Sequence, residues 1–283
     1  MTAMNDPQPF EIPAEDSTER NGTERAETGP ALRGWFNAGE TRGHQAAPCL
    51  LMIDLPGTHP SGFERIWTDL VSRLNARGVH TAQVSMPGDD TAPLPTQAGN
   101  WARSLERTVR WLSEHFPVEP TRIGLLGMRH GAQLLSEERT RHLQLDRAAF
   151  LSPRFETYPG SENPPAPEDR SPDGGDAAET NVVSIHAGAT FDPEHAASPA
   201  ETDLSPELST DILLIAGAAA ETEAADELWW MQSKLLAAGW PATHELIAQC
   251  DASFSGRQIE MLCEDRLHLF FMPLTRRAAR RTR

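Results

Sequence analysis

Residues 122–135 read RIGLLGMRHGAQLL, and this stretch decides how the rest of the chain is interpreted. An apolar run ends in the motif Gly-x-Arg-x-Gly, formed by Gly127, Arg129 and Gly131, and small or apolar residues follow it. The pattern predicts a buried strand, a sharp turn and a helix, because glycine permits tight turns and close approach of the backbone. Arg129 then stands at the tip of the turn, at the carboxyl end of a strand.

Strand-like and helix-like segments alternate on both sides of this stretch. Apolar runs closed by turn residues predict strands at 49–57, 79–88, 122–126, 148–153, 211–217 and 243–250. Helical periodicity predicts helices at 61–78, 100–116, 226–239 and 256–271, the first with an apolar face of Phe63, Ile66, Trp67, Leu70, Val71 and Leu74. This alternation predicts an α/β fold with a mostly parallel sheet and helices on both of its faces.

Composition divides the chain into a core and three polar segments. Residues 1–46 are acidic and poor in apolar side chains, so we expect a disordered arm, except that Trp35 and Phe36 form either a short edge strand or a docking segment. The core comprises residues 47–154 and 211–274. Between its halves, residues 155–210 form an acidic, Pro/Gly-rich insert that we expect to be mobile, and residues 275–283 form a basic tail.

Charge and cysteine content exclude several classes of function. The formal net charge of -16 disfavours binding to nucleic acid. Three widely spaced cysteines exclude a disulfide framework and the usual zinc sites, and they fit a reducing cytoplasm. No signal peptide and no run of about 18 apolar residues is present in the sequence. No phosphate loop, dinucleotide fingerprint or metal-ligand spacing occurs, so we expect no cofactor and no metal.

From residue 49 to residue 271 the chain resembles the α/β-hydrolase fold. The tip of the turn corresponds to the nucleophile elbow, Gly-x-Ser-x-Gly, and the acidic insert falls where such proteins carry a cap. Within the fold, the chain is most similar to the exosortase A system-associated hydrolases of the second type. Their elbow resembles G-L-R-L-G-A, against G-M-R-H-G-A here, and their P-P-F-W-Q motif is matched at Phe254 only. The resemblance implies a link to extracellular polysaccharide and protein-sorting gene clusters.

The residues of a Ser-His-Asp triad are missing from their expected places. The nucleophile position is Arg129, whose guanidinium has no lone pair with which to attack a carbonyl. The acid position reads alanine at 218–220, and the histidine position reads Asp251, Ala252 and Ser253. His244 and His268 fall inside a predicted strand and a predicted helix, and Ser85 and Ser152 have no evident base. The catalytic residues are therefore unknown.

The candidate ligand-binding residues are Arg129, His130, Gly57 and Asp251. A helix N-terminus offers unpaired N–H groups, and an arginine beside it favours a carboxylate, phosphate or sulfate. Gly57 lies in a loop that either donates N–H groups to an oxyanion or is only a turn before a helix. Alternatively, Arg129 forms a structural ion pair with Asp54, Asp89 or Asp251.

Three functions remain open from the sequence. The first is a non-catalytic homologue that binds a small anionic ligand or a protein partner. The second is a true ester or thioester hydrolase with an unrecognised nucleophile. The third is a scaffold whose acidic segments bind a basic partner.

Overall fold

The computed structural model describes residues 6–14, 29–40, 46–55, 63–88, 94–136, 145–153, 210–217, 222–237, 239–247 and 256–275, together with residues 140, 143, 250 and 254. Eight strands form one sheet: β1 (Gln8–Ile12), β2 (Leu32–Asn37), β3 (Ala47–Asp54), β4 (His80–Ser85), β5 (Val118–Met128), β6 (Leu145–Leu151), β7 (Asp211–Gly217) and β8 (Ala242–Ile247). The helices are α1 (Phe63–Asn75), α2 (Leu94–His115), η1 (Arg129–Ser136), α4 (Thr222–Ala237), α5 (Arg257–Phe271) and η3 (Met272–Thr275).

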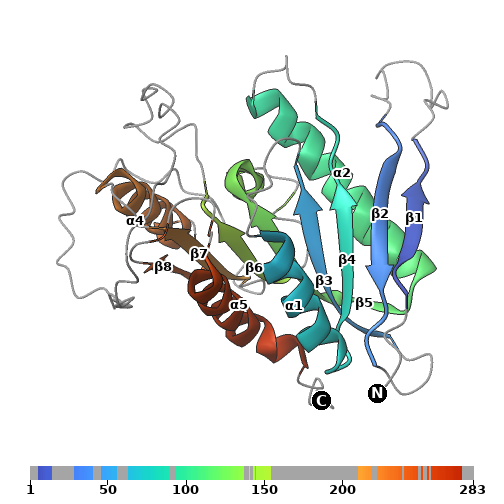
Figure 1. The fold of residues 1–283 in the computed structure, drawn as a ribbon. Coiled ribbons are helices and arrows are strands. Elements are labelled where there is room, and N and C mark those ends of the chain that lie inside the picture. Colours follow the sequence, from blue (N-terminus) through green and yellow to red (C-terminus); the bar gives the residue numbers. More distant parts are fainter. Residues whose placement is uncertain are drawn as a thin grey trace, which may run out of the picture.

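The sheet is parallel except at its N-terminal end. The strand order is β1-β2-β4-β3-β5-β6-β7-β8, in which β2 runs antiparallel to both β1 and β4 and all other neighbours are parallel (Figure 1). The predicted α/β class is confirmed, because each parallel neighbour is reached through a crossover rather than a hairpin. The parallel strands share one carboxyl edge, where the turn at Arg129 lies.

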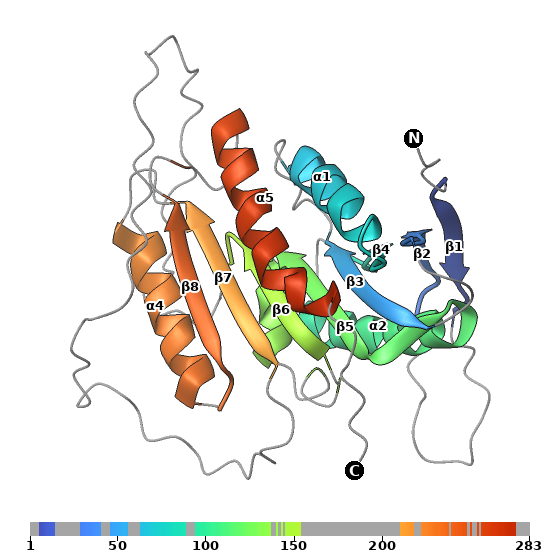
Figure 2. The same ribbon diagram turned by 90° about the horizontal axis from the view of Figure 1, so that it is seen from below.

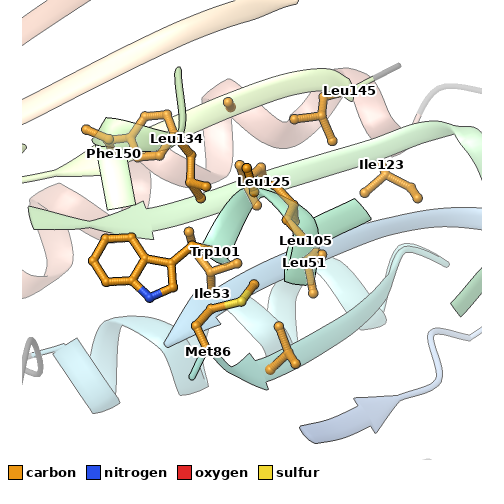
Figure 3. Packing of buried hydrophobic residues seen from close by; sticks show 14 of the residues in the cluster. Leu51, Ile53, Met86, Trp101, Leu105, Ile123, Leu125, Leu134, Leu145 and Phe150 are labelled. Atoms are coloured by element: carbon orange, nitrogen blue, oxygen red, sulfur yellow. The ribbon is translucent and has the colours of Figure 1, made fainter. Parts of the chain in front are cut away.

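Helices cover both faces of the sheet, as the periodicity predicted. Helices α1 and α5 lie on one face, while α2 and α4 lie on the other (Figure 2). All six apolar positions predicted for α1 are buried. On the α2 face, the side chains of β3, β5 and β6 pack against α2 and η1, as Figure 3 shows for Leu51, Leu105, Leu125, Leu134 and Phe150.

The prediction of a disordered arm over residues 1–46 is wrong for two segments of it. β1 and β2 form an antiparallel pair that extends the sheet, and β2 contains Trp35 and Phe36. β2 is not an edge strand, since it lies between β1 and β4. The few apolar side chains alternate along the two strands and reach the core on one face, namely Phe10, Ile12, Leu32 and Phe36. Average composition conceals such a period-two pattern, because every second residue is polar.

The acidic insert falls between two neighbouring strands. β6 ends at Leu151, β7 begins at Asp211, and the two are hydrogen-bonded to one another. The insert therefore leaves and re-enters the sheet between adjacent parallel strands. Residues 154–209 lie outside the described residues, so the predicted mobility of the insert stays a prediction, and the basic tail beyond Thr275 lies outside them too.

Candidate ligand site at the strand–helix turn

The turn after β5 holds Arg129 in an uncommon backbone conformation. Its φ is 45°, in the left-handed region, and η1 begins at the same residue. Few non-glycine residues adopt this conformation, which costs about 1–3 kcal/mol and persists where the surrounding structure imposes it. The predicted sequence of strand, sharp turn and helix is thus present, with Arg129 at its tip. The helix is of the tighter 3-10 type.

Both glycines of the motif are closely packed, and Gly127 more tightly than Gly131. A Cβ atom on Gly127 would lie 2.8 Å from the ring of Phe150 and 3.3 Å from Cδ1 of Ile53. A Cβ atom on Gly131 would lie 3.3 Å from Cδ1 of Ile53 and 3.7 Å from Cδ1 of Leu55. Ile53 therefore packs against both glycines, and the turn closes over the end of β3 because neither position carries a side chain.

The guanidinium of Arg129 is charged and only partly exposed. Its Nε is buried and has no hydrogen-bond partner, and within the described residues the side chain makes no ion pair. An ion pair with Asp54, one of the alternatives from the sequence, is therefore not observed, while Asp89 and Asp251 lie outside the described residues. A buried donor without an acceptor is uncommon in native proteins and favours binding of an external acceptor.

Two polar side chains of η1 lie next to the turn in sequence. His130 is partly buried and its Nδ1 is shielded from solvent, while Gln133 is 8% exposed. The first N–H groups of a 3-10 helix have no partner inside the helix. The turn therefore offers a guanidinium and backbone donors, and two polar side chains follow in η1. Gly57 and Asp251, the other two predicted ligand residues, lie outside the described residues.

A second strained residue lies beside Arg129, and the sequence did not reveal it. Met128 and Leu151 are paired in the register of β5 and β6, so Arg129 and Ser152 leave neighbouring strands at the same level. Ser152 has a φ of 44°, is 8% exposed, and donates its N–H to the carbonyl of Ile215 at 2.7 Å. The proline that follows Ser152 restricts its backbone, so no local signal predicts this conformation.

His244 and His268 lie within secondary structure and do not supply a catalytic base to this edge. His244 lies within β8 and shares a hydrogen bond of 2.7 Å between its Nδ1 and Oε1 of Gln232, and burial lowers its pKa. His268 is buried in α5, where burial and then Arg73 and Arg77 lower its pKa. Both occupy the interior of secondary structure, as the sequence predicted. The residues after β7 and most of those after β8 lie outside the described residues, and their sequence contains no histidine.

The described residues offer no metal site and no membrane span. No group of three or more His, Cys, Asp or Glu side chains that could hold a metal is present among them. His186 and His195, in the acidic insert, lie outside this part of the chain. None of the described helices is long and apolar enough to cross a membrane.

The fold is that of α/β-hydrolases. Est1E from Butyrivibrio proteoclasticus is similar in structure, with a TM-score of 0.50 and 16% identity over 86% of this chain and 94% of that chain. A dienelactone hydrolase from Anabaena variabilis has a TM-score of 0.53 and 14% identity over 94% and 98%. MGS-M1, an alpha/beta hydrolase enzyme from a deep-sea metagenome library, has a TM-score of 0.53 and 11% identity over 87% and 92%.

These similarities establish the fold class and leave the finer family open. No protein-family model matches the sequence, and no curated protein matches it. The eight-stranded, mostly parallel sheet agrees with the α/β-hydrolase resemblance of the sequence. At such low identity the chemistry of these proteins does not transfer to this chain.

Proposed function

We propose that the protein is a non-catalytic member of the α/β-hydrolase fold that binds a small anionic ligand through Arg129. The observation that carries the proposal is the buried Nε of Arg129, which has no hydrogen-bond partner. Leaving such a donor unsatisfied costs about 1–3 kcal/mol, in addition to the strain of a left-handed arginine. An oxyanion that accepts from Nε and the adjacent Nη with two of its oxygens would satisfy that donor and neutralise the charge.

The neighbouring groups suit a carboxylate, a phosphate or a sulfate. The ring of His130 can donate a hydrogen bond, and it carries a positive charge when it is protonated. The first N–H groups of η1 are further donors. The proposed site also includes Gly57 and Asp251, Gly57 as a backbone donor in the loop after β3. The donors among these groups favour an oxyanion at the carboxyl edge of the sheet, whereas the carboxylate of Asp251 opposes it.

The residue types at the expected triad positions do not support catalysis. An arginine cannot act as a nucleophile, and the segment after β8 contains no histidine to serve as base. The arginine at the elbow also supports a closer relation to exosortase A system-associated hydrolases and their exopolysaccharide systems. A cytoplasmic location belongs to the same proposal, since Cys49, Cys250 and Cys263 are buried thiols.

The test replaces Arg129 by serine and by lysine. We expect inorganic phosphate, sulfate or acetate to raise the melting temperature of the wild-type protein, by the equivalent of about 2.7 kcal/mol at a hundredfold excess over Kd. Arg129→Ser abolishes this stabilisation and Arg129→Lys retains part of it, because lysine keeps the charge without the fork. Arg110→Ser, which removes an exposed arginine of α2, is the matched control and leaves the stabilisation unchanged.

A different result would show that Arg129 has a structural role. If ligand-free Arg129→Ser melts far below wild type, by about 3 kcal/mol or more, the arginine is paired with an acid such as Asp89 or Asp251. The proposal of an anion site is also wrong if none of the three anions raises the melting temperature of the wild-type protein. A protein partner at the same edge then becomes the leading function.

The alternative function is an ester or thioester hydrolase. The left-handed backbone of Ser152 favours it. This serine shares with Arg129 the carboxyl edge and the left-handed backbone that a nucleophile elbow requires. A fluorophosphonate probe labels only an activated serine, so we expect no labelling and no hydrolysis of p-nitrophenyl esters above background. Labelling that disappears in Ser152→Ala would replace the binding proposal by the hydrolase.

A further inference from the structure

A cleft away from Arg129 lies on the N-terminal end of the sheet. Its volume is about 540 Å³, and β1, β2, β4 and the end of β3 supply its walls. Such a volume lies within the range of small-molecule sites. In Figure 1, β1 and β2 lie to the right of α1, so the described helices on that face leave them uncovered.

One row of this cleft is an aromatic platform. The strand register places Pro9, Trp35 and Gln83 side by side, and Met52 continues the row beneath α1. Trp35 is 51% exposed, which makes it one of the few large apolar side chains left open to solvent among the described residues. A flat indole flanked by a proline and an amide suits a ring with an apolar face and polar edges.

The second row, two residues further along each strand, is polar throughout. Register places Glu11 beside Arg33, Arg33 beside Ser85, and Ser85 beside Asp54. Arg33 and Glu11 approach to 3.4 Å between Nε and Oε2. With a spacing of about 4.8 Å between strands, the row presents acceptors and donors in turn over about 14 Å.

The charges in this row decide between classes of ligand. An anion would face the carboxylates of Glu11 and Asp54, on a protein whose net charge is already -16. A cation would face the guanidinium of Arg33 in the centre of the row. A neutral ligand meets neither repulsion, and one with several hydroxyl groups can use the alternating donors and acceptors.

We propose that this cleft binds a neutral saccharide, whose ring stacks on Trp35 and whose hydroxyl groups contact the row from Glu11 to Asp54. The length of the row suits two or three sugar rings better than one. The site is separate from the turn at Arg129, since none of the residues that line the cleft belongs to β5 or η1.

The test measures binding of a panel of neutral di- to tetrasaccharides of glucose, galactose, mannose and N-acetylglucosamine. We expect saturation-transfer NMR to detect at least one of them at millimolar affinity. Trp35→Ala weakens that binding by about tenfold or more, the loss of one stacking contact, and Gln83→Ala weakens it less. The matched control is Leu269→Ala, at a side chain that is 62% exposed on α5 and outside the cleft, and it leaves binding unchanged.

Three outcomes would overturn the proposal. They are a panel in which no saccharide binds, binding that Trp35→Ala leaves intact, and preferential binding of spermidine or adenosine monophosphate at the same residues. Arg129→Ser keeps the saccharide affinity of wild type if the two sites are independent. If no saccharide binds, the proposal of an anion site at Arg129 is unaffected. If no anion binds at Arg129, the proposal of a saccharide site is likewise unaffected.

Discussion

Among the described residues, Arg129 and Ser152 bring backbone strain to the ends of two neighbouring strands. Both have φ angles near the left-handed minimum, 45° and 44°, and both directly follow a parallel strand at the carboxyl edge. Phe254, with a φ of 53° and buried, is a third such residue in the segment between β8 and α5. Strained residues concentrate at binding and catalytic sites because the rest of the fold must hold them there. The neighbouring pair Arg129 and Ser152 therefore supports a function at this edge.

Replacing Gly127 tests whether close packing around the turn contributes to stability. We expect Gly127→Ala to lower the free energy of unfolding by about 1–3 kcal/mol, since its methyl group would meet the Phe150 ring at 2.8 Å. Urea denaturation measures the change. Gly131→Ala serves as the control and costs less, because its nearest neighbour is the flexible end of Ile53 at 3.3 Å. Equal stability of Gly127→Ala and wild type would mean that the Phe150 ring moves aside.

At the scale of elements, the pair β1–β2 is held to the core by α2. Arg107, only 6% exposed, donates from Nη1 to the carbonyl of Pro30 at 3.0 Å and from Nη2 to that of Pro13 at 2.6 Å. These carbonyls lie just before β2 and just after β1. Phe36 stacks on Phe116 at 3.9 Å between ring centroids. One arginine therefore ties both ends of the connection to the middle of a helix.

Replacing this arginine should loosen the first two strands. We expect Arg107→Ala to cost about 1.5–3 kcal/mol, because two carbonyls lose a charged donor. Hydrogen exchange should accelerate in β1 and β2 and change little in β5. Arg110→Ala, one turn further along at an exposed position of α2, is the control. Uniform acceleration over the whole sheet would show instead that β1–β2 unfolds only together with the core.

At the scale of the whole molecule, buried histidines make stability depend on pH. Burial lowers the pKa of His80 below its ordinary value of 6.5, against an opposing contribution from the Pro117 backbone, and burial also lowers the pKa values of His244 and His268. His80 accepts the N–H of Gly39 at its Nδ1 at 2.9 Å, so it is neutral there in the folded state. Protonation would break that hydrogen bond.

The sign of the pH dependence follows from these lowered values. Well above about pH 6.5 the three rings are neutral in both states and the stability is fully present. As the pH falls below that value, the unfolded chain takes up protons that the folded protein refuses, so the free energy of unfolding decreases. Urea denaturation at several pH values between about 7.5 and about 5 measures this. His80→Asn keeps an acceptor for Gly39 without a titrating ring, and it should show a weaker dependence; an unchanged slope would exclude His80 as a contributor.

The sequence by itself determined the parallel core of the fold. Strands β3 to β8 and helices α1, α4 and α5 were predicted close to their places, because buried faces impose a period that is visible in a single chain. It also predicted that Arg129 stands at the tip of a turn, because an apolar run precedes it and two glycines flank it. That the protein lacks a Ser-His-Asp triad stays a prediction from the residue types. The second helix was predicted to begin at residue 100, because Asn100 resembles an N-cap residue. In the structure α2 begins at Leu94, and Pro95 is tolerated there because it lies in the first turn of the helix.

Only the tertiary structure decided which residues meet. Trp35 precedes β3 in the sequence and Gln83 follows it, and the two residues lie side by side because β2 pairs with β4. That pairing is set by the order of strands in the sheet. The left-handed backbone at Ser152 and the buried Nε of Arg129 likewise depend on neighbours distant in sequence. Local periodicity reports which face of an element is buried. It carries no information about the partner across that face, because burial against any apolar surface yields the same pattern.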